Sequence, residues 1–118
     1  MYTIGIDVGG TNLKAGLVNE AYEIVATSKM PLVWQSQEKL AGDLSALAED
    51  AAEKAGVSKA EVASIGIGFP GAVDSRRGAV IQTVNIPIRE MPVAELMRPR
   101  WNVPIHLGND ADCAALGE

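Results

Sequence analysis

The sequence predicts an α/β protein in which one mixed sheet carries helices. Three observations predict this class: strand-like runs open the chain, a helical period replaces them after Ser36, and a further strand-like run follows that helix. With 118 residues, 47% of them hydrophobic, the chain has the size and composition of one globular domain with its own core.

The first three elements read as strands. Tyr2–Val8 is an apolar, partly alternating run that suits a buried strand, and a glycine-rich turn follows it. Leu13, Ala15 and Leu17 then alternate with polar or small residues, as in a strand with one buried face. A short turn precedes a third strand over 22–30, so tight turns join all three into an antiparallel meander.

Apolar residues recur at helical spacing between Ser36 and Ala55, which predicts an amphipathic helix that ends before Gly56. Ser58–Glu61 matches a capping box and predicts one short helical turn. The apolar residues of the predicted long helix are Leu40, Leu44, Leu47, Ala48, Ala51 and Ala55.

Five further elements are expected in the rest of the chain. Val62–Phe69 is an apolar run closed by Pro70 and Gly71, which predicts a fourth strand. Residues 72–83 have a polar centre with Gly78 between apolar arms, as in a small hairpin, and 91–97 hold a brief helix. A strand over 102–107 and a helix from 111 complete a β-β-β-α-β-hairpin-α-β-α order.

Charge and composition disfavour several classes of partner. The net charge is −5 and the pI about 4.8, whereas nucleic-acid binders are usually basic. No run approaches the length of a membrane span, and no basic leader precedes the first strand. Cys113 is the chain's single cysteine and reads as a small apolar helix residue. We therefore expect a reduced, cytoplasmic protein without nucleic-acid or membrane partners.

The turn formed by Gly9, Gly10 and Thr11 is the first candidate site. Glycines let successive backbone N–H groups approach an anion, and Thr11 adds a hydroxyl. Asp7, just before the turn, would repel a phosphate directly but suits a Mg²⁺ ion held through water between the two. The alternative is a plain hairpin turn with glycine at positive φ and Asp7 as a solvated strand end.

Two other turns carry candidate residues. The stretch GIGFPG matches the dinucleotide pattern G-x-G-x-x-G, but no helix follows it, so Pro70–Gly71 reads as a strand-ending turn whose backbone could face a ligand. Asn109 and Asp110 stand where a strand gives way to a helix, and Asp110 could accept a hydroxyl proton that Asn109 orients. The alternative role there is helix capping, for which Asp112 is a third candidate.

The remaining polar residues give weaker signals. His106 is the lone histidine and reads as structural or as a support for the neighbouring cluster. Asn85 either lines a cleft or occupies a turn. Four arginines read as solvated surface charges: Arg76, Arg77, Arg98 and Arg100.

The order of these stretches carries more information than any one of them. DVGGTNLKAGLV, GIGFPGAVD, TVNIP and GNDADCAALGE, in that order, resemble the N-terminal lobe of the ROK family of sugar kinases and sugar-responsive repressors. The resemblance covers nearly the whole chain. It implies a ribonuclease-H-like lobe of the actin/hexokinase superfold, with residues 1–118 as the N-terminal kinase lobe and a second lobe absent from this chain.

The resemblance also assigns roles to residues. In similar kinases the matching turn contacts nucleotide phosphates, the residue matching Asp7 serves Mg²⁺, and the residue matching Asp110 is the catalytic base. The family usually has Asn and Ala where this chain has Asp112 and Cys113, which are neighbours of that base. By this reading the phosphate-binding residues are Gly9, Gly10, Thr11 and Asn12, and the sugar-binding residues are Gly71, Asn85, Asn109 and Asp110.

The function implied is ATP-dependent transfer of the γ-phosphate to a hexose hydroxyl, with Mg²⁺ and with glucose as the first candidate acceptor. N-acetylated amino sugars, mannose and fructose stay open, and zinc is expected only if the second lobe carries the family's Cys site. We expect the isolated chain to be inactive and to self-associate as a homo-oligomer. The alternatives are a sugar-sensing transcriptional regulator of the same family and a non-catalytic sugar-binding lobe.

Overall fold

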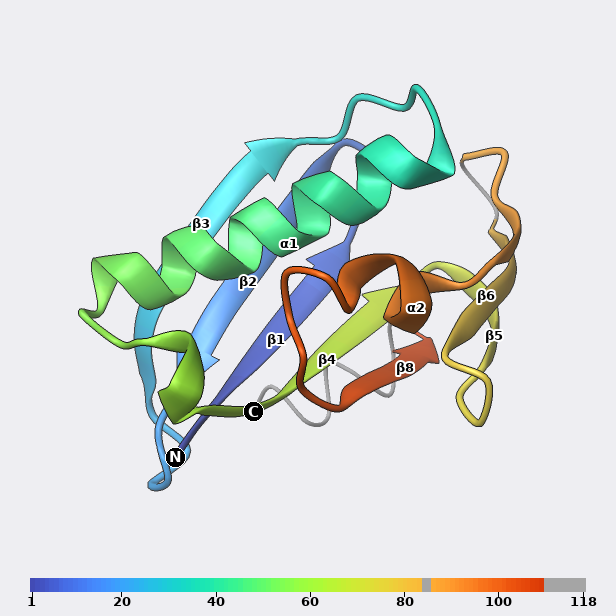
Figure 1. Ribbon diagram of the computed structural model, residues 1–118. Coiled ribbons are helices and arrows are strands. Elements are labelled where there is room, and N and C mark those ends of the chain that lie inside the picture. Colours follow the sequence, from blue (N-terminus) through green and yellow to red (C-terminus); the bar gives the residue numbers. More distant parts are fainter. Residues whose placement is uncertain (84–85, 110–118) are drawn as a thin grey trace.

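The computed structural model describes residues 1–83 and 86–109, which form two sheets and the helices packed on them. A five-stranded mixed sheet has the order β3-β2-β1-β4-β8, and a three-stranded antiparallel sheet has the order β5-β6-β7 (Figure 1). The strands are β1 Tyr2–Val8, β2 Asn12–Val18, β3 Ile24–Pro31, β4 Val62–Phe69, β5 Gly71–Asp74, β6 Ala79–Thr83, β7 Arg89–Met91 and β8 Ile105–Asn109.

The antiparallel meander β1-β2-β3 is confirmed, but β3 begins at Ile24 rather than Tyr22. The side-chain oxygen of Asn19 accepts hydrogen bonds from the backbone N–H groups of Ala21 (2.9 Å) and Glu23 (3.0 Å). These bonds keep the chain in a wide turn, with Tyr22 at a φ of 63°. A left-handed residue cannot continue a strand, so the prediction was two residues early.

Helix α1, Gln37–Lys54, confirms the predicted long helix. The Ser36 hydroxyl caps it by accepting from the Lys39 N–H at 3.0 Å, and Gly56 follows its end at a φ of 69°. Its apolar stripe is buried against the sheet.

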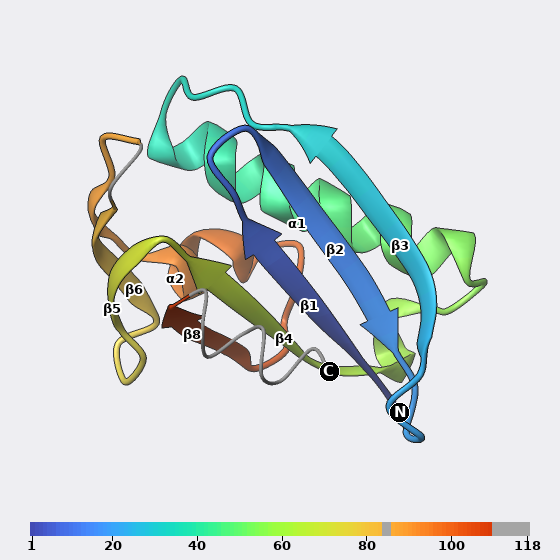
Figure 2. The ribbon, with the colours of Figure 1, turned by 180° about the vertical axis from the view of Figure 1, so that it is seen from behind.

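Both α1 and α2, Val93–Met97, lie on the same face of the five-stranded sheet, as the two opposite views show (Figures 1 and 2). Neither helix has the length and apolar character needed to cross a membrane.

The parallel half of the sheet follows a short 3-10 turn, η1, at Lys59–Glu61. The Glu61 carboxylate accepts from the Ser58 N–H at 2.9 Å, as the predicted capping box requires. β4 then pairs parallel with β1, and β8 pairs parallel with β4. The strand predicted over 102–107 lies instead at 105–109, because Pro104 has no N–H for the ladder and offers its carbonyl to the Ile65 N–H (3.0 Å).

The predicted hairpin is confirmed as β5 and β6, and it carries a third strand, β7, that was not predicted. Gly78 turns the hairpin at a φ of 65°, and its carbonyl accepts from the Ala94 N–H (3.1 Å), which attaches α2 to the hairpin. β7 is only three residues long, too short for alternation to reveal it. The helix expected from residue 111 lies outside the described residues.

A charged cluster fixes α1 to the chain that leads into β8. Trp101 is fully buried, and its ring N–H donates to the Ser45 carbonyl at 3.0 Å. Glu49 pairs with both Lys59, at 2.7 Å, and Arg100. The Lys59 ammonium also lies 4.9 Å from the centre of the Trp101 ring. Arg100 is exposed, as predicted for a surface charge, but the prediction missed that it belongs to an ion-pair network.

Replacement of Glu49 by Gln should lower stability at pH 7 by about 1 kcal/mol, because it removes the shared partner of two cations. Burial acts to raise the pKa of Glu49, but hydrogen bonds from Arg100 and Lys59 outweigh it and hold the pKa below 4.5. A lowered pKa adds stability above the unfolded value of 4.5, and this stability is lost as the pH falls through the folded value.

Urea unfolding of wild type and Glu49→Gln should therefore differ at pH 7, and the difference should shrink as the pH is lowered below 4.5. Glu53→Gln, on an exposed position of the same helix, is the matched control and should leave stability nearly unchanged. A Glu49→Gln deficit that is the same size across this pH range would contradict the assignment.

Candidate functional site

The candidate site lies at the edge of the main sheet where three parallel strands end. β1, β4 and β8 run in the same direction (Figure 2). In their register, Asp7 lies beside Gly68 and Phe69 beside Asn109. The turn at 9–11, the Pro70–Gly71 turn and the end of β8 therefore meet along one edge. Ligands of open α/β sheets bind at such carboxyl ends. The structure thus brings together segments that stand about 100 residues apart in the chain.

In the turn at 9–11, Gly9 is needed for close approach, and neither glycine has a positive φ. The positive-φ glycines of the described ranges are Gly56 and Gly78. The Gly9 N–H donates to the Asn12 carbonyl at 2.9 Å, and a Cβ on Gly9 would lie 3.0 Å from that oxygen. Thr11 supports the turn from both sides: its hydroxyl accepts from the Asn12 amide (3.1 Å), and its carbonyl accepts from the Leu32 N–H (2.9 Å). The Gly9 N–H is thus engaged inside the turn.

Asp7 lies on the face of the sheet opposite α1. Ile4, Ile6 and Val8 point into the core, and the side chain of Asp7 is exposed between them. A carboxylate is a hard oxygen ligand of the kind Mg²⁺ prefers. No group of three or more His, Cys, Asp and Glu side chains gathers in the ranges that the structure describes. One carboxylate suffices for Mg²⁺ when phosphate oxygens and water supply the other ligands, so Asp7 fits that ion.

Gly71 is required by the packing of β5 on β6. A Cβ on this residue would stand 2.1 Å from the Gln82 carbonyl oxygen and 2.7 Å from the Thr83 Cα. No side chain fits there without moving one strand. The Thr83 hydroxyl in turn donates to the Ile86 carbonyl at 2.5 Å. Both readings of Gly71 stay open, since a turn can meet a structural need and still present its backbone to a ligand.

The last group of predicted residues is described in part. Asn109 ends β8, and its position opposite Phe69 puts it at the candidate edge. His106 is exposed three rows before Asn109, opposite Gly66 on β4. Four residues of the sequence-based predictions lie outside the described residues: Asn85, Asp110, Asp112 and Cys113.

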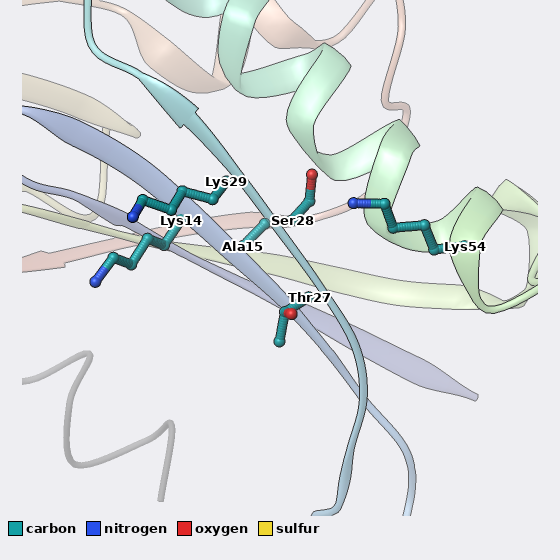
Figure 3. A pocket seen from close by; sticks show the side chains of 6 residues that line it. All are labelled: Lys14, Ala15, Thr27, Ser28, Lys29 and Lys54. Atoms are coloured by element: carbon teal, nitrogen blue, oxygen red, sulfur yellow. The ribbon is translucent and has the colours of Figure 1, made fainter.

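Two lysines near this edge were missed by sequence reasoning. Lys14 on β2 is the register partner of Asp7 and of Lys29 on β3, so the three side chains form one row across the sheet. A hollow of about 370 Å³ lies beside this row (Figure 3). Strand alternation could have put both lysines on one face, but only the register makes them neighbours. The hollow is lined by Lys14, Ala15, Thr27, Ser28, Lys29 and Lys54.

Comparison with known proteins decides the family. Residues 3–118 match the profile of the ROK family. The chain belongs to the ROK family. A glucokinase of Streptomyces coelicolor is 36% identical to this chain over 116 residues. The match covers 98% of this chain and 35% of the glucokinase. The xylose repressor of Caldicellulosiruptor bescii is 29% identical over 116 residues, covering 98% and 29% of the two chains.

The solved structures of the family agree with the fold. The structure of a ROK family glucokinase from Streptomyces griseus, in complex with glucose and AMPPNP, superposes on this chain with a TM-score of 0.85 at 34% sequence identity. The match covers 98% of this chain and 35% of that glucokinase. The ribonuclease-H-like fold of the actin/hexokinase superfold, which the resemblance implied, is thereby confirmed. The chain spans about a third of the length of these glucokinases.

The same substitution at two glycines should have opposite effects on stability. Gly71→Ala forces a Cβ into the Gln82 carbonyl and should destabilise the fold by about 1–3 kcal/mol. Gly42→Ala, in the middle of α1 with no atom within 4 Å of the new Cβ, should stabilise by about 0.5–1 kcal/mol through helix propensity.

Chemical denaturation of the two variants beside wild type measures both changes. If Gly71→Ala were as stable as wild type, the β5–β6 packing would not be what requires glycine at this position, and the ligand-facing interpretation would gain weight.

Proposed function

We propose that this chain is the N-terminal lobe of an ATP-dependent sugar kinase that transfers the γ-phosphate to a hexose hydroxyl. The observation that carries the proposal is the single sheet edge that joins Asp7, the turn at 9–11 and Asn109, the residue directly before Asp110. A kinase needs its donor and acceptor sites side by side, because the transferred group moves only between adjacent oxygens. Support comes from the glucokinase relatives, one of them solved with glucose and a nucleotide analogue.

The donor side of the proposed site is the turn and the strand end before it. Gly10 and Thr11 would direct backbone N–H groups at a phosphate, since the Gly9 N–H is bonded within the turn. Asp7 and bound water would hold Mg²⁺, which when bound neutralises charge on the phosphate oxygens. Asn12, at the start of β2, keeps the turn closed through its carbonyl and its amide.

The acceptor side is assigned from the order of the sequence. Asp110 would accept the proton of the attacking hydroxyl as its oxygen bonds to the γ-phosphorus and the bond to the donor breaks. Asn109, Asn85 and the backbone at Gly71 would hold the sugar. Glucose is the proposed acceptor. N-acetylglucosamine, mannose and fructose are the substrates to compare with it.

The rest of the proposal concerns the whole protein. The adenosine pocket and further sugar contacts would come from a second lobe, and a zinc ion is part of the proposal only if that lobe carries the family's Cys site. The single Cys113 suits the cytoplasm, where thiols stay reduced. We also propose a homo-oligomer, because a lobe that forms one wall of a cleft exposes surface that other subunits or lobes cover.

A sugar-responsive repressor is the second candidate, favoured by the similarity to the xylose repressor. Such a protein would bind the sugar at the same edge without turning it over. The negative net charge of this chain gives it no electrostatic attraction to DNA, so a repressor would need a separate DNA-binding segment.

The full-length protein should phosphorylate glucose when it is supplied with ATP and Mg²⁺, and the 118-residue chain alone should not, because it would supply only one wall of the cleft. A coupled assay for glucose 6-phosphate measures both, with the other hexoses run in parallel. Sugar binding by the full-length protein without turnover of any hexose would favour the repressor or the non-catalytic lobe.

Asp110→Asn in the full-length protein tests the proposed base. Asparagine keeps the shape and an acceptor oxygen but cannot take a proton, so kcat should fall about 10²–10⁴-fold while sugar affinity changes little. Asn caps helices as well as Asp does, so a capping role predicts a silent substitution.

Thermal unfolding of the Asp110→Asn variant serves as its control. A variant that is as stable as wild type and retains near-normal kcat would remove Asp110 from the mechanism.

A further inference from the structure

We propose that Lys14 and Lys29 bind the phosphate chain of the phosphoryl donor and so extend the anion site from the turn at 9–11 along the sheet. The inference rests on the proposed kinase function and adds a binding element that the turn does not supply. The ligand chemistry is a condensed phosphate chain, whether it belongs to a nucleoside triphosphate or to an inorganic polyphosphate.

The first step is the position of the two side chains. Lys14 and Lys29 are direct register partners on β2 and β3, and both are exposed on the face opposite α1. Their side chains extend in the same direction from neighbouring strands (Figure 3). Two lysines therefore stand next to each other on one face of a chain whose net charge is −5.

The second step is that their pairing is unfavourable without a ligand. Like charges directly opposite each other on antiparallel strands destabilise the pair, and the one carboxylate of this row, Asp7, is the partner of Lys14 and not of Lys29. The lysines that form ion pairs in the described ranges are Lys39, Lys54 and Lys59, and these do not include the pair on this face. An anion between the two ammonium groups would remove the repulsion.

The third step is the distance to the proposed donor site. Asp7 stands beside Lys14 in the same row and only two residues before Gly9, which is about 7 Å along a strand. The end of β3 is fixed to the turn, because the Leu32 N–H donates to the Thr11 carbonyl at 2.9 Å. From a phosphate bound at the turn, the rest of the phosphate chain would extend toward this row.

Lys54 supplies the matched control. It lines the same hollow, but it extends from α1 on the other side of β3, where its ammonium pairs with Asp50 at 3.0 Å (Figure 3). Replacing Lys54 by Gln changes the net charge by the same amount as replacing Lys14 or Lys29 by Gln. A general effect of charge would therefore affect all three variants alike, whereas a site would affect only two.

The experiment compares Lys14→Gln, Lys29→Gln, the double variant and Lys54→Gln in the full-length protein. The KM for ATP should rise about ten-fold in each single variant at the site and more in the double, because each loses a charge-assisted contact. Lys54→Gln should stay within two-fold of wild type, and Lys14→Arg should keep most of the affinity. The KM for the sugar should not change.

Binding of tripolyphosphate and of adenosine, measured by calorimetry, makes the test independent of kinase activity. Tripolyphosphate affinity should fall in Lys14→Gln and Lys29→Gln as much as ATP affinity does, and adenosine affinity should not change. Lys29→Gln should also unfold at higher temperature than wild type without ligand, because it removes the repulsion and leaves Lys14 beside Asp7.

The outcomes separate this inference from the proposed function. A protein that does not phosphorylate hexoses but binds tripolyphosphate through both lysines refutes the kinase and keeps the anion site. An active kinase in which the site variants behave like Lys54→Gln refutes the anion site and keeps the kinase. Loss of ATP binding without loss of tripolyphosphate binding would also overturn the inference.

Discussion

The in-register parallel pairing of β1 with β4 and of β4 with β8 is the constraint on which the rest of this structure depends. Parallel strands end at the same edge of a sheet, so the pairing of Asp7 with Gly68 and of Phe69 with Asn109 fixes three strand ends in one line. A shift of one residue in either pair would turn every apolar side chain of that strand out of the core. Burial of Ile65, Ile67 and the residues beside them therefore fixes the edge where chemistry is proposed.

That register depends on the packing of one face. α1 lies across the strands, and Trp101 anchors the chain before β8 to α1 through its bond to the Ser45 carbonyl. Glu49 adds the ion pairs to Lys59 and Arg100 at the same place. These contacts hold β8 in the sheet although it is only five residues long. Packing on the helix side thus supports a site whose proposed residues lie at the edge and on the opposite face.

The sequence alone predicted the elements with a strong period and missed those fixed by contacts between distant residues. α1, β1, β2 and β4 follow from apolar spacing, whereas the start of β3 depends on the Asn19 side chain and the start of β8 on Pro104. The same holds for the candidate site. The turn at 9–11 was found from its composition, but the reason for Gly9 is the nearby Asn12 carbonyl, and the Lys14–Lys29 pair exists only once the strand register is known.

The two faces of the main sheet meet different physical demands. On the helix side, local preference and packing agree, with apolar side chains at every inward position of β1 and β2. On the other face, Gly5, Gly16 and Gly66 stand side by side in strand interiors, and two lysines oppose each other. Strand glycines and like-charge pairs both lower stability. Residues that lower stability in this way are typical of functional sites, and here they share one face of the sheet with Asp7.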